Sequence, residues 1–167
     1  GVIFFTDQIE LYIPPKKGKS HILRIIRELI EFQPKSNGTD ISEALRFLSS
    51  VVKKRSIVFA LSDFQDEDYD KNLKIASNKH DLTAIRIFDT AEEQLPNMGL
   101  VQIQNPESGA TRWVDTSSKL VRANYEKDYI EFVQKFKSNC THSGTDYIDL
   151  RVDRSYTKQL LEFFKRR

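Results

Sequence analysis

Apolar and polar residues along this chain form alternating blocks with the lengths and periods of strands and helices. Short runs of branched and aromatic residues predict strands, at residues 2–5, 9–13, 56–62, 82–88, 100–104, 111–114 and 147–150. Apolar residues spaced three and four apart predict helices, at residues 20–32, 41–54, 69–79, across 121–136 and at 156–164. Strands alternating with helices predict an α/β domain, with a mostly parallel sheet between two helical layers.

The strand patterns differ in how much burial they predict. Residues 2–5 show no polar alternation, so we expect this strand to be covered on both faces. The run at 56–62 is the strongest one, and we expect it at the centre of the sheet. Residues 9–13 alternate and are followed by Pro14 and Pro15, a pattern typical of a half-exposed edge strand.

The first two helices have recognisable faces and starts. Residues 20–32 carry one broad apolar stripe for packing, formed by Ile22, Leu23, Ile26, Leu29 and Ile30. Ser20 is expected to cap the start of this helix. The next helix begins near residue 41, with Thr39 or Asp40 as its cap.

Length and composition narrow the class of protein. The 167 residues, 39% hydrophobic and 30% charged, suit one globular domain. A net charge of +2 does not favour nucleic acid as a partner. Cys140 is the only cysteine, which excludes an internal disulfide and fits a reducing compartment such as the cytoplasm. The apolar runs are too short for a membrane span.

Thr39 and Asp63 are the candidate metal ligands of this chain. Thr39 lies in a polar loop before a predicted helix, and Asp63 directly follows the apolar strand at 56–62. Because strand ends of a parallel sheet are where α/β sites form, we expect both side chains at the same edge of the sheet. A hydroxyl and a carboxylate are suitable oxygen ligands for Mg²⁺. An Asp-x-Ser-x-Ser loop would complete the site, and the sequence does not contain one after a central strand.

Several short segments, taken in order, resemble one bacterial family. They are residues 1–7 (Gly-Val-Ile-Phe-Phe-Thr-Asp), 12–18 (Tyr-Ile-Pro-Pro-Lys-Lys-Gly), 38–40 (Gly-Thr-Asp), 61–64 (Leu-Ser-Asp-Phe) and 113–116 (Trp-Val-Asp-Thr). The set resembles the von Willebrand factor A-like family of unknown function, DUF58, which is found beside MoxR-type AAA+ ATPases. The resemblance implies a Rossmann-like fold and a protein-binding role in MoxR-linked chaperone-like or assembly work.

The resemblance also implies a metal site. In that superfamily a metal-ion-dependent adhesion site combines an Asp-x-Ser-x-Ser loop, a threonine and an aspartate. Thr39 matches the threonine and Asp63 the aspartate. The chain departs from the family pattern because it opens on what resembles the family's second strand. Residues 1–167 are therefore expected to be an incomplete domain, the fragment of a longer protein, that binds Mg²⁺ weakly or not at all.

The same resemblance places the absent strand between the strands at 2–5 and 57–61. Both strands would then present unpaired N–H and C=O groups, which are costly to bury. We expect self-association through these edges, in preference to direct pairing of the two strands within one chain.

Two functions remain open from the sequence. The first is a non-enzymatic interaction module, in which a metal at Thr39 and Asp63 binds an acidic side chain of a protein partner. The alternative is a metal-dependent phosphohydrolase that uses Asp7, Asp63 and Asp66 around Mg²⁺. No general base or anion-binding group is identifiable for this second function.

Overall fold

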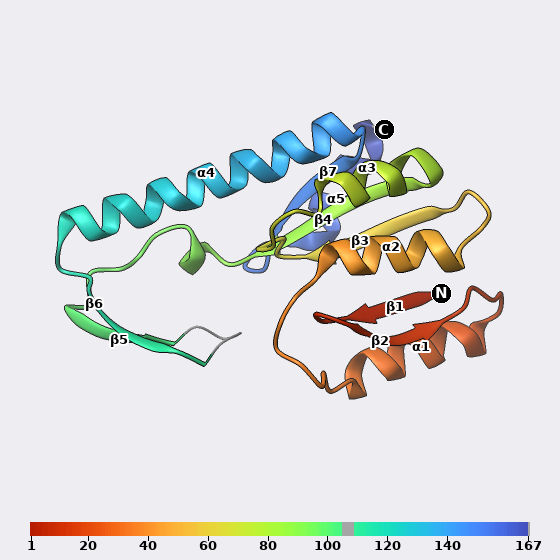
Figure 1. The fold of residues 1–167 in the computed structure, drawn as a ribbon, viewed down its shortest axis with the longest axis horizontal. Helices are drawn as coiled ribbons and strands as arrows, with labels where there is room; N and C mark the ends of the chain where they lie inside the picture. Colours follow the sequence, from red (N-terminus) through yellow and green to blue (C-terminus); the bar gives the residue numbers. More distant parts are fainter. Residues whose placement is uncertain (105–108, 167) are drawn as a thin grey trace.

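The computed structural model describes residues 1–104 and 109–166. Its strands are β1 (Val2–Phe5), β2 (Ile9–Ile13), β3 (Ile57–Ser62), β4 (Asp81–Phe88), β5 (Leu100–Gln104), β6 (Thr111–Asp115) and β7 (Asp146–Arg151). Its helices are α1 (Lys19–Glu31), α2 (Ile41–Val51), α3 (Asp70–Lys79), the 3₁₀ turn η1 (Thr90–Glu92), α4 (Lys119–Ser143) and α5 (Tyr156–Arg166). All the strands and helices expected from the sequence are present (Figure 1).

Within the described residues the strands form three separate sheets. The central one is parallel, with the order β3-β4-β7, and β1-β2 and β5-β6 are antiparallel pairs. The expected hairpin is confirmed by the pairing of Val101 with Val114 and of Ile103 with Arg112. Its expected turn falls largely on 105–108, outside the described residues.

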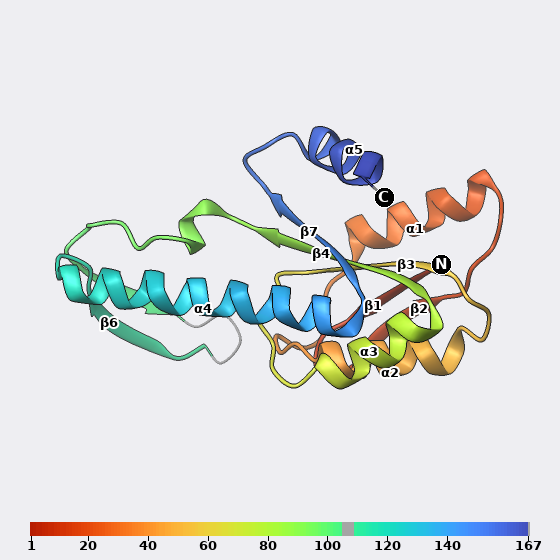
Figure 2. The ribbon, with the colours of Figure 1, turned by 90° about the horizontal axis from the view of Figure 1, so that it is seen from above.

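The helices form layers on the two sides of the strands. Figure 2 shows α1 and α5 on one side, and α2, α3 and α4 on the other. The main core lies on the second side, where Val58 and Ala60 of β3 pack against it. It is formed by Ile41, Leu45, Phe64, Tyr69, Leu73, Ala76, Leu82, Ala84, Phe136 and Cys140. The arrangement is a layered α/β fold with a parallel sheet, consistent with a Rossmann-like architecture.

Two expectations about burial were wrong. Strand β1 is only partly buried, and β3 lies at the edge of its sheet. One face of β3 is open to solvent, with Phe59 43% and Leu61 54% exposed, and its free edge is not paired with another described strand. Strands β1 and β3 are not hydrogen-bonded to each other in the part of the chain described. This agrees with the expectation that they do not pair directly within one chain.

The apolar stripe of α1 is also exposed, contrary to expectation. Its five large apolar residues are between 47% and 77% exposed. The neighbouring Phe32, at the C-terminal end of α1, does pack on β1, with its ring centroid 4.8 Å from that of Phe4. The stripe lacks a cover because β1 and β2 form a sheet of only two strands.

The helix caps were predicted with mixed success. Asp40 caps α2, since its Oδ1 accepts a hydrogen bond of 2.6 Å from the Glu43 N–H. The expectation for Ser20 was wrong, because α1 begins at Lys19 after Gly18 and no side chain caps it. Gly18 has φ 112°, a conformation that favours glycine. None of the described helices is long and apolar enough to cross a membrane.

Candidate functional site

Three loops are joined at the carboxyl ends of β1 and β3. The loop of residues 36–40 is bound on one side to the end of β1, where the Asp40 N–H donates to the Thr6 carbonyl oxygen at 2.9 Å. On the other side, the Ile41 N–H donates to Oδ2 of Asp66 at 2.7 Å. Asp66 belongs to the loop that follows β3. Thr39 is therefore held between the loops that follow the two strands.

Gly38 allows the close approach of two of these loops. A Cβ atom at this position would lie 3.2 Å from the Cβ atom of Asp7 and 3.5 Å from its Cγ atom. The contact with the Cβ atom is tighter than most real Cβ contacts, so a larger residue would push Asp7 away. A glycine is therefore favoured before Thr39, because it lets the two loops approach each other closely.

Asp63 and Thr39 differ in their hydrogen bonding. Oδ1 of Asp63 accepts from the Gln65 N–H at 3.1 Å and from the Ser62 hydroxyl at 3.3 Å. This stabilises the turn after β3, as a strand-end aspartate commonly does. The Thr39 hydroxyl is half-buried and forms no hydrogen bond to the residues that the structure describes. Both side chains can offer an oxygen atom to a cation.

The acidic side chains considered as metal ligands do not gather at one point of the described structure. No three His, Cys, Asp or Glu side chains lie together as a metal-binding group within residues 1–104 and 109–166. The set of Asp7, Asp63 and Asp66 considered for a phosphohydrolase is thus not brought together. Asp66 instead binds backbone N–H groups, those of Ile41 and Glu67, each at 2.7 Å.

Phe64 fixes the loop after β3 in an unusual conformation. Its φ of 60° lies in the left-handed region, which bulky residues rarely adopt. The side chain is fully buried, and its ring centroid lies 4.8 Å from that of Phe136. Asp68, with φ 58°, repeats the left-handed conformation in the same loop. Packing of the Phe64 ring therefore sets where the preceding Asp63 lies.

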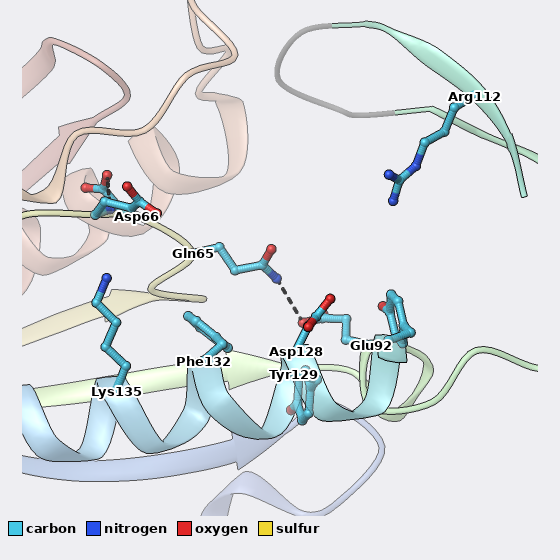
Figure 3. Close-up of a pocket in the computed structure, with 10 residues that line it drawn as sticks. Gln65, Asp66, Glu92, Arg112, Asp128, Tyr129, Phe132 and Lys135 are labelled. Carbon is cyan, nitrogen blue, oxygen red and sulfur yellow. Dashed lines mark hydrogen bonds between the residues drawn. The ribbon is translucent and has the colours of Figure 1, made fainter. Parts of the chain in front are cut away.

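A cleft of about 490 Å³, lined mainly by charged and aromatic residues, adjoins this loop. It lies between the loop after β3, η1, β6 and α4, and its lining includes Gln65, Glu92, Arg112, Asp128 and Lys135 (Figure 3). Gln65 donates to Glu92 across it, with Nε2 and Oε2 3.4 Å apart. Neither Thr39 nor Asp63 lines the cleft, and the sequence did not indicate it.

Arg86 forms a buried charged cluster on the helix α4 side of the sheet. It is 2% exposed and pairs with Asp149 of β7, with Nε and Oδ1 2.7 Å apart. Its guanidinium carbon lies 4.2 Å from the ring centroid of Phe88, and the Tyr129 hydroxyl accepts from Nη1 at 3.2 Å. Burial opposes the charge, but the bonds to Tyr129 and Asp149 outweigh it and raise the pKa of Arg86. These contacts connect β4 and β7 to α4, and the cluster contains no nucleophilic side chain.

Cys140 is not a reactive thiol. It is fully buried within the core, and burial, with a smaller effect of the Asp149 charge, raises the pKa of its thiol to about 12. A thiol with that pKa is protonated at neutral pH and is a poor nucleophile and metal ligand.

One family matches most of the chain, and the similar mycobacterial proteins are uncharacterized. Residues 1–134 match the family described as "Protein of unknown function DUF58". An uncharacterized Mycobacterium avium protein, MAV169, is 23% identical over 158 residues, which cover 93% of each chain. The Mycobacterium tuberculosis protein Rv1480, also uncharacterized, is 22% identical over 166 residues, and the chain spans 52% of its length.

One solved structure shares the fold. It is the crystal structure of the conserved hypothetical protein BatB from Bacteroides thetaiotaomicron, with a TM-score of 0.53 and 15% identity. The alignment covers 98% of this chain and 75% of the BatB chain. At this level of identity the match supports the layered fold alone.

Proposed function

The chain belongs to the DUF58 family of proteins of unknown function, and we propose that it is a non-enzymatic protein-interaction module with a von Willebrand factor A-type fold. The main support is the loop of residues 36–40, which is hydrogen-bonded to the loops at the ends of both β1 and β3. This loop carries Thr39, whose hydroxyl forms no hydrogen bond to a described residue, between the loops that follow β1 and β3.

Thr39 and Asp63 would hold a metal ion at this site. Their hydroxyl and carboxylate are hard oxygen donors of the kind that Mg²⁺ prefers. Two protein ligands leave most of the octahedral shell to water, so we expect the chain alone to bind Mg²⁺ weakly. The bound ion would supply a positive charge for a carboxylate of the partner. Oδ1 of Asp63 would still accept the hydrogen bond from the Gln65 N–H that stabilises the turn after β3.

The partner we propose is a MoxR-type AAA+ ATPase, in chaperone-like or assembly work. Support comes from the resemblance of the ordered segments to proteins found beside such ATPases. A partnership of this kind would place the module in the cytoplasm.

Self-association through the free edges of β1 and β3 is a second part of the proposal. Each strand is hydrogen-bonded on one side alone within the described residues. Neither contains proline or a charged residue, the devices that commonly protect a strand edge from pairing with another chain.

Manganese-induced broadening of backbone amide NMR signals tests the metal site, because it detects weak binding. Mn²⁺ takes the same oxygen ligands as Mg²⁺. We expect sub-stoichiometric Mn²⁺ to broaden residues 38–40 and 63–65 together, and both Thr39→Val and Asp63→Asn to remove the effect. Asp68→Asn is the matched control, since it removes an exposed carboxylate from the same loop and should leave the effect intact. Broadening centred on 66–70, with 38–40 unaffected, would contradict the assignment.

A further inference from the structure

Asp66 uses both oxygen atoms of its carboxylate to hold two separate segments of the chain. Oδ1 accepts from the N–H of Glu67 in its own loop, and Oδ2 accepts from the N–H of Ile41, 25 residues earlier, each at 2.7 Å. Hydrogen bonds to a charged acceptor are stronger than those between neutral groups. Ile41 is the first residue of α2, so the carboxylate also lies at the positive end of that helix dipole. The side chain thus connects the loop after β3 firmly to the start of α2.

Ile41 is a rigid point of attachment for the Thr39 loop. Its side chain is 2% exposed and belongs to the main core. Thr39 lies two residues before it, and between them Asp40 caps α2 and donates its N–H to the Thr6 carbonyl oxygen. The two backbone N–H groups that follow Thr39 are therefore both hydrogen-bonded to other loops. As a result, the place of the Ile41 N–H determines where the Thr39 hydroxyl lies.

The loop after β3 is anchored in the same core. Phe64 is fully buried there, directly after Asp63. The Gln65 N–H closes the turn by donating to Oδ1 of Asp63 at 3.1 Å. Oδ2 of Asp63 accepts no hydrogen bond from the residues that the structure describes. The loop therefore holds two aspartates that differ: Asp63 has a free oxygen atom, whereas both oxygen atoms of Asp66 already accept hydrogen bonds.

We propose that Asp66 is a positioning residue, which holds Thr39 in place relative to Asp63 without itself binding the ion or the partner. This role rests on the interaction site proposed above and adds a third residue to it. In the described part of the chain, the bond from Ile41 to Asp66 is the only hydrogen bond between residues 36–41 and 62–69. Without the Asp66 carboxylate, the Thr39 loop stays bonded to the end of β1 but loses its link to the loop that carries Asp63.

Amide hydrogen exchange and amide chemical shifts, measured by NMR without metal, test the link itself. In Asp66→Ala we expect the Ile41 N–H to exchange at least about tenfold faster and the signals of residues 38–40 to shift, because a charge-assisted hydrogen bond is lost. Asp66 contributes no side chain to the core, so alanine should leave the fold intact. Asp66→Asn should keep most of the protection, since its side-chain oxygen still accepts. Glu67→Ala is the matched control, because it removes an exposed carboxylate at the next position and should change neither readout.

A Mn²⁺ titration of the same variants tests whether the link matters to the site. We expect Asp66→Ala to need at least about tenfold more Mn²⁺ for the joint broadening of residues 38–40 and 63–65, the usual cost of removing a group that orients a metal ligand. Asp66→Asn should recover most of this loss, and Glu67→Ala should show none. Recovery by asparagine separates a positioning residue from a ligand, because binding through the carboxylate itself would depend on the negative charge that asparagine lacks.

Each contrary result has a separate meaning. Unchanged exchange of the Ile41 N–H in Asp66→Ala would overturn the link, and an unchanged Mn²⁺ requirement in that variant would overturn its importance for the site. An asparagine variant as weak as the alanine variant would make Asp66 a metal ligand instead of a positioning residue. No joint broadening in the unmodified chain would refute the proposed metal site, and the exchange and shift measurements without metal would then decide by themselves whether Asp66 positions Thr39.

Discussion

Phe64→Ala is expected to lower the free energy of unfolding by about 3–5 kcal/mol, the usual cost of truncating a buried phenylalanine. Phe64 is fully buried, and its ring centroid lies 4.8 Å from that of Phe136 and 5.9 Å from that of Tyr69. Alanine would leave a cavity among these rings while keeping the unfavourable φ of 60°. Denaturant unfolding at a fixed protein concentration measures the change.

Trp113→Ala is the control for the Phe64 substitution. It removes an even larger side chain, but one that is 65% exposed on β6. Its effect should stay within about 0.5 kcal/mol. Similar costs for the two substitutions would show that Phe64 does not anchor the core or the loop that carries Asp63.

Asp149→Ala is expected to destabilise the fold by about 3–5 kcal/mol, because it leaves the charge of Arg86 buried without its partner. Arg86 is 2% exposed, and its Nε lies 2.7 Å from Oδ1 of Asp149. Lys137, 3.4 Å from the other carboxylate oxygen, would lose its partner as well. The double variant Arg86→Met, Asp149→Ala should be less destabilised than Asp149→Ala alone, since it removes the buried charge.

Asp153→Ala provides the matched comparison for this pair. Asp153 also pairs with an arginine, Arg151, but its side chain is 47% exposed. Its loss should cost far less than the loss of Asp149, because an exposed ion pair contributes little to stability. The single variant Arg86→Met completes the comparison. If the double variant lost at least as much unfolding free energy as Arg86→Met and Asp149→Ala lose together, the buried charge would not be the source of the cost.

Local patterns in the sequence predicted the elements well. The hairpin at 100–104 and 111–114 and the Asp40 cap depend on neighbouring residues, and both are confirmed. Ser20 failed as a cap although it is a suitable residue, because the helix begins at Lys19 after Gly18 and Ser20 lies within its first turn.

Long-range arrangement was harder to predict. The apolar run of β3 suggested a central strand, but a run of side chains does not reveal whether both edges are paired. Arg86 interrupts an apolar strand, a visible signal of a buried charge, yet its partner Asp149 lies 63 residues away. The buried, left-handed Phe64 could not be foreseen, because a φ above zero is unusual for phenylalanine.

The candidate site was predictable in part. Thr39 and Asp63 were singled out by type and place, and the structure holds their loops at the same end of β1 and β3. The links that hold them were not predicted, since the Asp66 carboxylate and the Ile41 N–H are 25 residues apart. Asp66, considered as a metal ligand from the sequence, is used to bind the start of α2.

Binding to a purified MoxR-type AAA+ ATPase of the same organism tests the proposed function most directly. Interferometry with the chain immobilised would compare Mg²⁺ with EDTA, and Asp63→Asn with the control Asp68→Asn. We expect binding in Mg²⁺ that weakens at least about tenfold, or 1.4 kcal/mol, in EDTA or with Asp63→Asn, and that Asp68→Asn preserves. No binding, or equal binding with and without the metal and the Asp63 carboxylate, would contradict a metal-dependent interaction module.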